Sequence, residues 1–329
     1  MTTRMGTGGA MSKFSGVLLA ATIFAGAALA AENDVPTWAY AVPSGYTPPA
    51  GPMDAQKHVP ESDRTFSVGQ TREIFNVPDW HPDDHAAPPD LILHGRRVEA
   101  CAHCHLPNGQ GSNLTRAPGL VGLSKAYMLQ QFADFKSGAR STVVADYGAP
   151  RMMSFILQTA SAEELDQAAT YFASLTPRPW VRVVEAARVP QTGFVDQMPV
   201  ALKDGGTEPI GMRIVEVPED TERAELRDSH AGYIAYVPPG SLKLGEALAT
   251  TGANGKTIAC ITCHGLDLRG LGPVPSLAGR SPSYIVRQMY DMQHGARTGL
   301  WTPLMIPVVN KLKPADMVAV AAYAASRAP

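Results

Sequence analysis

Apolar side chains recur at helical spacing in two distant parts of the chain. Between residues 165 and 172 they repeat every three or four positions, and Ser161 and Glu164 ahead of them match a capping box. Between residues 317 and 325 they repeat in the same way, after Pro314 at a position suited to a first helical turn. The pattern predicts a helix in each segment.

Each of these helices closes a longer stretch that occurs twice. The segment 118–140 aligns with 275–297, and ten of the 23 aligned positions are identical. Within the two copies, residues 128–137 and 285–294 read as a middle helix. The period is far too long for a solenoid, so we interpret the pattern as one duplicated unit.

Two other parts of the chain lie outside the duplication. Residues 31–94 contain many prolines and little periodicity, which predicts a mostly irregular extension that packs on the rest of the chain or on a partner. Residues 179–240 join the two copies, and alternating apolar residues at 181–189 and 212–217 predict strands. At about 60 residues this connector is longer than a plain linker.

The first 30 residues have the order of an export signal. Arg4 and Lys13 precede an apolar stretch, Phe14 to Ala30, which ends in small residues. We expect cleavage after Ala30 and a periplasmic protein. The alternative is an uncleaved membrane anchor, but the stretch has only 17 residues, fewer than the roughly 20 that a spanning helix needs.

Composition agrees with a folded, exported protein. The 329 residues are 45% hydrophobic and 18% charged, with a formal net charge of −2. Loss of Arg4 and Lys13 with the signal would leave 26 basic against 30 acidic residues, a net charge of −4. This balance gives no basic footprint for a nucleic-acid partner.

The cysteines carry the chemistry. All four belong to two Cys-x-x-Cys-His motifs, 101–105 and 260–264. This is the attachment motif of haem c, in which two thiols bond one porphyrin and the following histidine binds the iron. A disulfide is the alternative for a cysteine pair in an oxidising compartment, but the histidine directly after each pair favours haem. We expect two covalent haem c groups, held by Cys101, Cys104, Cys260 and Cys263.

The axial ligands follow from the duplication. His105 and His264 are the proximal ligands of the motifs. Alignment of the last helices places Met153 on Met305, both in the loop ahead of that helix, and a thioether at both sixth positions would raise the potentials. Met152 is the alternative for the first haem, although its counterpart is a leucine. Plain core packing is the other interpretation of these methionines.

Several further residues have a possible role around the haems. The carbonyls of Pro118 and Pro275 are expected to accept the second N–H of each proximal histidine, unless the prolines only form turns. Four side chains are candidates to contact haem propionates or, equally, are ordinary surface residues: Tyr127, Tyr284, Arg140 and Arg297.

Histidines of the extension suggest another kind of site. His81 and His85 stand beside Asp83 and Asp84, a set that could bind a metal ion. The spacing is loose and the segment is rich in proline, so a solvated loop is the favoured interpretation.

The chain resembles dihaem class I cytochromes c, and it is cytochrome c4-like. The resemblance rests on the two Cys-x-x-Cys-His motifs, the Pro-x-Leu-x-Gly stretches that begin at Pro118 and Pro275, and the two methionines. The resemblance covers about 95–178 and 241–329. It implies a mostly α fold with two class I cytochrome c-like haem domains, here with an irregular N-terminal extension and a partly β connector. The long extension and connector depart from the family pattern.

The resemblance also implies a function. We expect a periplasmic electron-transfer protein rather than an enzyme, with redox protein partners: a dehydrogenase or quinol-oxidising complex as donor, and an oxidase or another cytochrome as acceptor. A cytochrome subunit of a periplasmic dehydrogenase complex is the alternative. A dihaem peroxidase or thiosulfate-oxidising enzyme is disfavoured, because both units offer a methionine and no cysteine is spare.

Overall fold

The computed structural model describes residues 35–40 and 51–329. The expected export signal and its cleavage after Ala30 lie outside these residues. None of the helices in the described ranges is long and apolar enough to cross a membrane. Helices take up 39% of the structure and strands 14%, so the expectation of a mostly helical fold is confirmed only in part.

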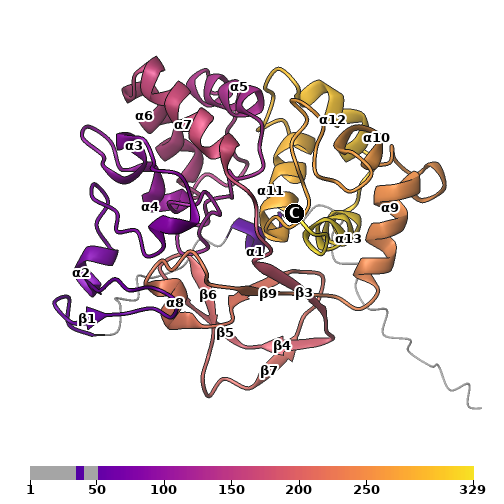
Figure 1. The fold of residues 1–329 in the computed structure, drawn as a ribbon. Helices are drawn as coiled ribbons and strands as arrows, with labels where there is room; N and C mark the ends of the chain where they lie inside the picture. The colour runs from indigo at the N-terminus through magenta and orange to yellow at the C-terminus, as the bar shows by residue number, and fades with distance from the viewer. Residues whose placement is uncertain (1–34, 41–50) are drawn as a thin grey trace, which may run out of the picture. The chain divides into compact units, whose positions relative to one another are not determined.

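Two groups of helices follow the same order along the chain (Figure 1). The first helical group is α3 Asp90–Leu93, α4 Cys101–His105, α5 Lys125–Lys136, α6 Ala149–Thr159 and α7 Ala162–Ser174. The second helical group is α9 Ser241–Gly255, α10 Ile261–His264, α11 Pro282–Gln293, α12 Thr302–Val309 and α13 Pro314–Ala325. In both groups a short attachment turn precedes a middle helix, a further helix and a last helix, as the duplication requires.

The predicted helices form close to where the sequence places them. Helix α7 begins at Ser161, whose hydroxyl accepts from the Glu164 N–H while the Glu164 carboxylate accepts from the Ser161 N–H at 2.7 Å. Helix α13 begins with Pro314. One expectation is wrong: residues 149–159 and 302–309, read as loops ahead of the last helices, are the helices α6 and α12. Both have a proline in their first turn, which fits the first turn because its N–H has no helical partner.

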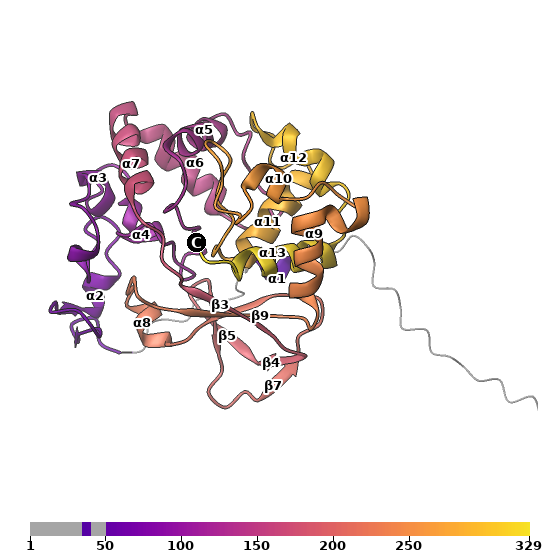
Figure 2. The same cartoon turned by 45° about the vertical axis from the view of Figure 1, so that its right-hand side comes forward.

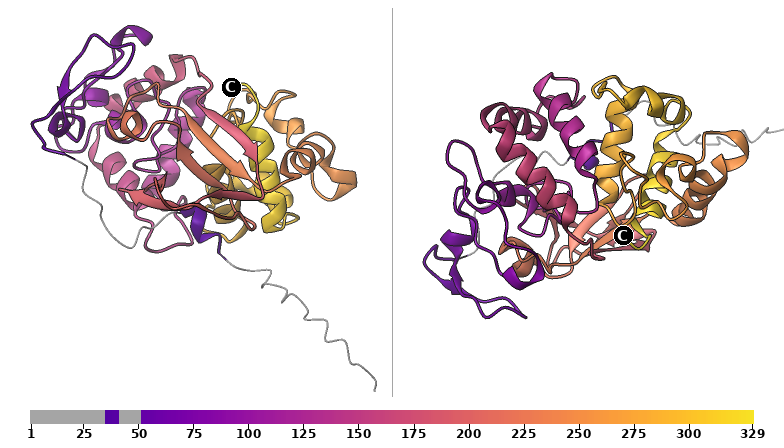
Figure 3. Two further views of the ribbon diagram at one scale, coloured as in Figure 1. Left: turned by 90° about the horizontal axis from the view of Figure 1, so that it is seen from below. Right: turned by 45° about the horizontal axis from the view of Figure 1, so that its top comes forward.

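The connector is built mainly from strands. It contains β3 Val181–Glu185, β4 Arg188–Pro190, β5 Thr192–Val195, β6 Met198–Ala201, β7 Thr207–Pro209, β8 Val215–Pro218, the short helix α8 Thr221–Glu225, and β9 Tyr233–Val237. Strand β9 pairs in parallel with β3 and antiparallel with β8. The strands expected at 181–189 and 212–217 are thus present over parts of those ranges. Helix α13 packs on β3 and β9, as Figures 2 and 3 also show.

The N-terminal extension has little regular structure, as expected. Its elements are α1 Thr37–Tyr40, the strand pair β1 Gln56–Lys57 and β2 Phe66–Ser67, α2 Val68–Thr71, and the 3-10 turn Pro82–Asp84. Helix α1 is nevertheless part of the core. Tyr40 is fully buried, donates to Asp291 of α11 at 2.8 Å, and packs edge-on against Tyr147. The extension therefore contacts both helical groups.

The largest core cluster lies in the second helical group, between α9, α11 and α13. Helix α13 is rich in alanine, and its small buried side chains let α9 approach closely. At Gly245 of α9 a Cβ atom would lie 2.0 Å from the backbone oxygen of Ala319. No side chain fits at this crossing without a shift of one helix.

We predict that Gly245→Ala lowers the free energy of unfolding by about 1–3 kcal/mol, the usual cost of overpacking. Guanidinium unfolding followed by circular dichroism measures it. Gly148→Ala is the matched control, because an added Cβ there meets only the tip of Arg151, at 3.8 Å. Equal effects of the two substitutions would contradict the close α9–α13 contact.

Candidate haem sites

The first attachment turn is a single buried turn of helix. Helix α4 starts after the extended residue Ala100 and ends at Leu106, whose φ of 62° breaks the helix. Cys101 and Cys104 lie one turn apart with unpaired thiols. Burial raises the pKa of Cys101 to about 12 and that of Cys104 to about 11. These neutral, partly buried thiols lie one helical turn apart, as two porphyrin attachment points require.

His105 has the arrangement of an iron ligand. Its Nδ1–H donates to the carbonyl oxygen of Pro118 at 2.8 Å, which leaves the lone pair on Nε2. That Nε2 atom is buried and has no hydrogen-bond partner. Burial lowers the pKa of His105 to about 4, so the ring is neutral at pH 7. A buried imidazole nitrogen without a partner is costly, and an iron ion bound there would satisfy it.

The second site repeats this arrangement. His264 ends the turn α10, is buried, and donates from Nδ1 to the carbonyl oxygen of Pro275, also at 2.8 Å. Burial lowers the pKa of His264 and raises that of Cys260 to about 11. Cys263 is exposed. Both expected proline carbonyl contacts are therefore confirmed.

The methionines lie on helices rather than in loops. Met153 of α6 packs in the same apolar cluster as Cys101. Met305 of α12 packs in the same cluster as Cys260. Met152, the alternative to Met153, is 45% exposed, and its counterpart Leu304 is 74% exposed. Burial beside an attachment cysteine thus favours Met153 over Met152.

The four residues considered for the propionates cross between the two copies. Arg140 of the first copy donates to the Tyr284 hydroxyl of the second at 2.9 Å, and Arg297 of the second donates to the Tyr127 hydroxyl of the first at 3.0 Å. The backbones of residues 139–141 and 296–298 also pair antiparallel. The structure thus brings these four side chains together in one symmetric contact. Tyr127 and Arg297 are buried, so they are not ordinary surface residues.

Sequence reasoning missed the glutamines of this contact. The amide oxygen of Gln131 accepts from both Arg140 and Arg297, and that of Gln288 does the same. The signal was present, because the two glutamines occupy equivalent positions of the aligned copies. Their joint role depends on how the copies face each other, which the alignment does not show.

The electrostatic potential at the contact between the two copies is positive. Burial alone would raise the pKa of the Tyr127 phenol, but Arg297 and Arg140 outweigh burial and lower it. Arg280 is also buried there, and it donates to the backbone oxygens of Gly119 and Val121 in the first copy. Arg297 Nε is buried without a partner. An anion such as a haem propionate would be stabilised here.

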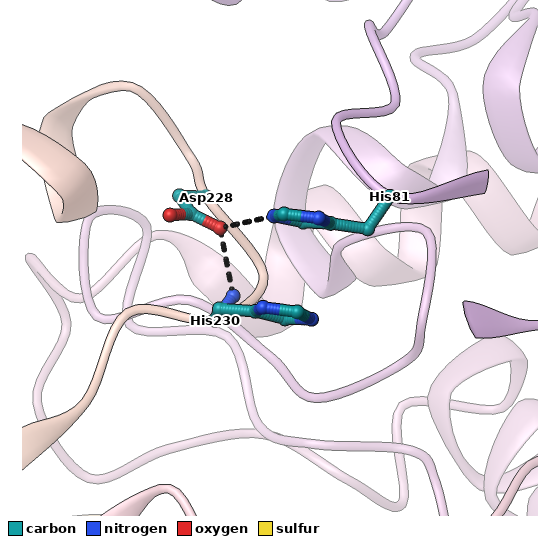
Figure 4. A group of neighbouring side chains, drawn as sticks. All are labelled: His81, Asp228 and His230. Atoms are coloured by element: carbon teal, nitrogen blue, oxygen red, sulfur yellow. Dashed lines mark hydrogen bonds and ion pairs between the residues drawn. The ribbon is translucent and has the colours of Figure 1, made fainter. Parts of the chain in front are cut away.

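His81 and His85 of the extension have buried side chains and do not lie in a solvated loop. His81 is 6% exposed, and its Nε2 lies 2.9 Å from Asp228, which also accepts from the His230 backbone N–H (Figure 4). The rings of His81 and His230 stack with centroids 3.8 Å apart and planes 3° apart. A metal ion lies in the plane of each imidazole that binds it, so stacked parallel rings are poorly arranged to share one. The favoured interpretation of a solvated loop is wrong because the connector covers the extension here.

The remaining contacts of this cluster are ionic. His230 lies 2.8 Å from Glu61 and 2.5 Å from Asp84, and Arg178 also donates to Asp84. Burial opposes charge on His230, but the hydrogen bonds to Asp84 and Glu61 outweigh it and raise its pKa. At His85 the hydrogen bond to Asp79, against burial, likewise raises the pKa.

Comparison with known proteins agrees with the geometry. A cytochrome c-554(548) from Halomonas halodenitrificans is 36% identical over 69 residues, which are 21% of this chain and 83% of that protein. A thiosulfate dehydrogenase electron acceptor from Thiomonas intermedia is 27% identical over 245 residues, 74% of this chain and 82% of that protein. Cytochrome c4 from Azotobacter vinelandii is 24% identical over 69% of this chain and 84% of that protein. No family model matches the chain.

The chain belongs to the c-type cytochromes. Within them it is a dihaem cytochrome of the cytochrome c4 kind, with two covalently bound haem c groups, and it transfers electrons. Its partners are accordingly other redox proteins.

The raised histidine pKa values predict a pH dependence of stability. A group with a raised folded pKa stabilises the fold fully below its unfolded pKa, near 6.5, and loses this contribution as the pH rises through the folded pKa. We therefore expect the free energy of unfolding to fall as the pH rises above about 6.5, measured by denaturant titration. The double variant His85→Gln, His230→Gln should lose most of this dependence. An unchanged slope in the variant would show that other groups cause it.

Proposed function

We propose that this protein is a periplasmic electron carrier with one haem domain at 95–178 and another at 241–329. Residues 1–30 form the export signal in this proposal, 31–94 the extension and 179–240 the connector. Cys101 and Cys104 hold the first haem, and Cys260 and Cys263 hold the second. The observation that supports this best is the paired arrangement of His105 and His264, each with Nδ1 bound to a proline carbonyl.

The axial ligands in this proposal are His105 with Met153 and His264 with Met305. Haem iron supplies reversible one-electron exchange when it is bound. The protein's own residues do the rest. The carbonyls of Pro118 and Pro275 fix each imidazole tautomer and raise the basicity of its ligand nitrogen. The apolar clusters around Cys101 and Cys260 keep water away.

The contact between the copies holds the propionates in this proposal. Arg140 and Arg297 each bond residues of the other copy, so a propionate bound there stabilises both domains at once. Arg297 is buried and Arg140 is partly buried, and an anionic partner would offset the cost of that burial. With methionine at both sixth positions, neither iron would have an open position for a substrate, and the chain would act as a carrier.

The donor in this proposal is a periplasmic dehydrogenase. The relative from Thiomonas intermedia is named as the electron acceptor of thiosulfate dehydrogenase, and the match extends over 82% of that relative. A thiosulfate dehydrogenase, as a separate protein or as a partner in a stable complex, is therefore the specific donor that we propose. A terminal oxidase or another cytochrome is the acceptor.

We predict that Met153→Leu removes a sixth ligand. The ferrous protein should then bind carbon monoxide at one of its two haems, and the weak red absorption band of methionine-bound ferric haem should lose about half its intensity. Met152→Leu is the matched control and should leave both spectra unchanged. The ligand assignment would be wrong if the control and not the Met153 variant lost the band.

A second experiment separates a carrier from an enzyme. The holoprotein is mixed with thiosulfate alone, and then with thiosulfate and a catalytic amount of thiosulfate dehydrogenase. We predict that both haems are reduced only when the dehydrogenase is present, as followed by the ferrous absorption bands. Turnover with thiosulfate alone would identify an enzyme, and reduction only by a different dehydrogenase would leave the carrier function intact with another donor.

A further inference from the structure

The two attachment turns differ in the charged residues next to them. In the first motif His103 stands between the cysteines, and Glu99 lies two residues ahead of Cys101. The equivalent residues of the second motif are Thr262 and Ile258. The connector reaches the first turn through the segment that follows α8. Near the second turn its strands β3 and β9 contribute apolar side chains to the cluster that contains Cys260.

Arg227 is the residue of the connector that reaches this turn. Its Nη1 donates to Nδ1 of His103 at 2.9 Å and to the backbone oxygen of the same residue. The side chain is 7% exposed, and its Nε is buried without a hydrogen-bond partner. Arg227 also has a φ of 59°, in the left-handed region that arginine rarely occupies. A strained residue with a buried charge is costly, and such residues concentrate at functional sites.

Other charges around Arg227 cancel only in part. Arg72 and Asp196 form an ion pair at 3.2 Å and offset each other. Glu99 lies on the far side of His103, with 3.8 Å between Oε2 and the ring Nε2. Glu99 and Arg227 therefore act on the first attachment turn with opposite sign.

The charge of Arg227 lies beside an attachment cysteine. Its Nη1 bonds His103, the residue directly before Cys104. Thr262, the equivalent residue before Cys263, is exposed. The first site thus lies in the field of a fixed buried cation that comes from outside the duplicated unit.

We propose that Arg227 raises the reduction potential of the haem held at Cys101 and Cys104. Ferric haem has one positive charge more than ferrous haem, so a buried cation nearby disfavours the ferric form. With both haems bound, this charge would shift the one-electron equilibrium between them toward a reduced first iron and an oxidised second iron. The connector thereby sets how electrons are distributed between the two haems. The inference rests on the proposed haem attachment.

The test is a spectroelectrochemical titration of the holoprotein and its variants. Arg227→Gln removes the positive charge and leaves the negative charge of Glu99 unopposed. Both changes lower the reduction potential of the first haem. We expect the equilibrium constant for electron transfer from the second haem to the first to fall about tenfold. For a one-electron couple this corresponds to a change of about 59 mV in the difference between the two reduction potentials. Arg227→Lys keeps the charge and should keep most of the potential. Arg182→Gln, which removes an exposed connector arginine paired with Glu219, is the control.

The reduction step that Arg227→Gln shifts must be assigned to the first haem. Met153→His replaces the proposed thioether ligand by imidazole, so the step that it lowers identifies that haem. The inference is overturned if Arg227→Gln leaves that step unchanged, if it lowers both steps equally, or if Arg227→Lys has the same effect as Arg227→Gln. A protein that binds fewer than two haems or shows no reversible steps would instead contradict the proposed function.

Discussion

The hydrogen bond from each motif histidine to a proline carbonyl is the interaction on which the rest of the structure depends. It occupies Nδ1 and so commits Nε2 of His105 and of His264 to accept rather than donate. The polypeptide must bring the loop at Pro118 or Pro275 back over the attachment turn to make this bond. The glycines of that loop make this return possible: at Gly111, for example, an added Cβ would lie 2.5 Å from the Gly119 nitrogen.

The contact between the two copies follows from the same loops. Arg280 continues from the Pro275 loop and bonds the backbone of Gly119 and Val121, directly after Pro118. The two loops that orient the histidines are thus joined by one buried guanidinium. Around it, Arg140 and Arg297 cross to the opposite copy. The glutamine and tyrosine oxygens of both copies accept from these guanidinium groups and so offset part of the cost of burying them.

Sequence alone predicted the parts of this structure that local pattern and duplication determine. The capping box at Ser161 and Glu164, the proline start of α13 and both proline carbonyl contacts are present. The segments of α6 and α12 were expected as loops, although a proline in the first turn of each is compatible with a helix. Contacts that join distant segments, such as Tyr40 with Asp291 or His81 with Asp228, leave no periodic signal.

Duplication by itself would give two haem sites with nearly equal properties. The residues that differ between the copies therefore matter more for electron transfer than those that agree. Part of the asymmetry comes from segments outside the copies: α1 contacts both helical groups, whereas the segment after α8 covers the attachment turn of the first copy. Because a connector of about 60 residues orders strands at a conformational cost, a role limited to joining two domains does not account for it. It places the charged Arg227 against the first attachment turn and apolar side chains of β3 and β9 in the core cluster of the second, which gives the two sites different electrostatic surroundings.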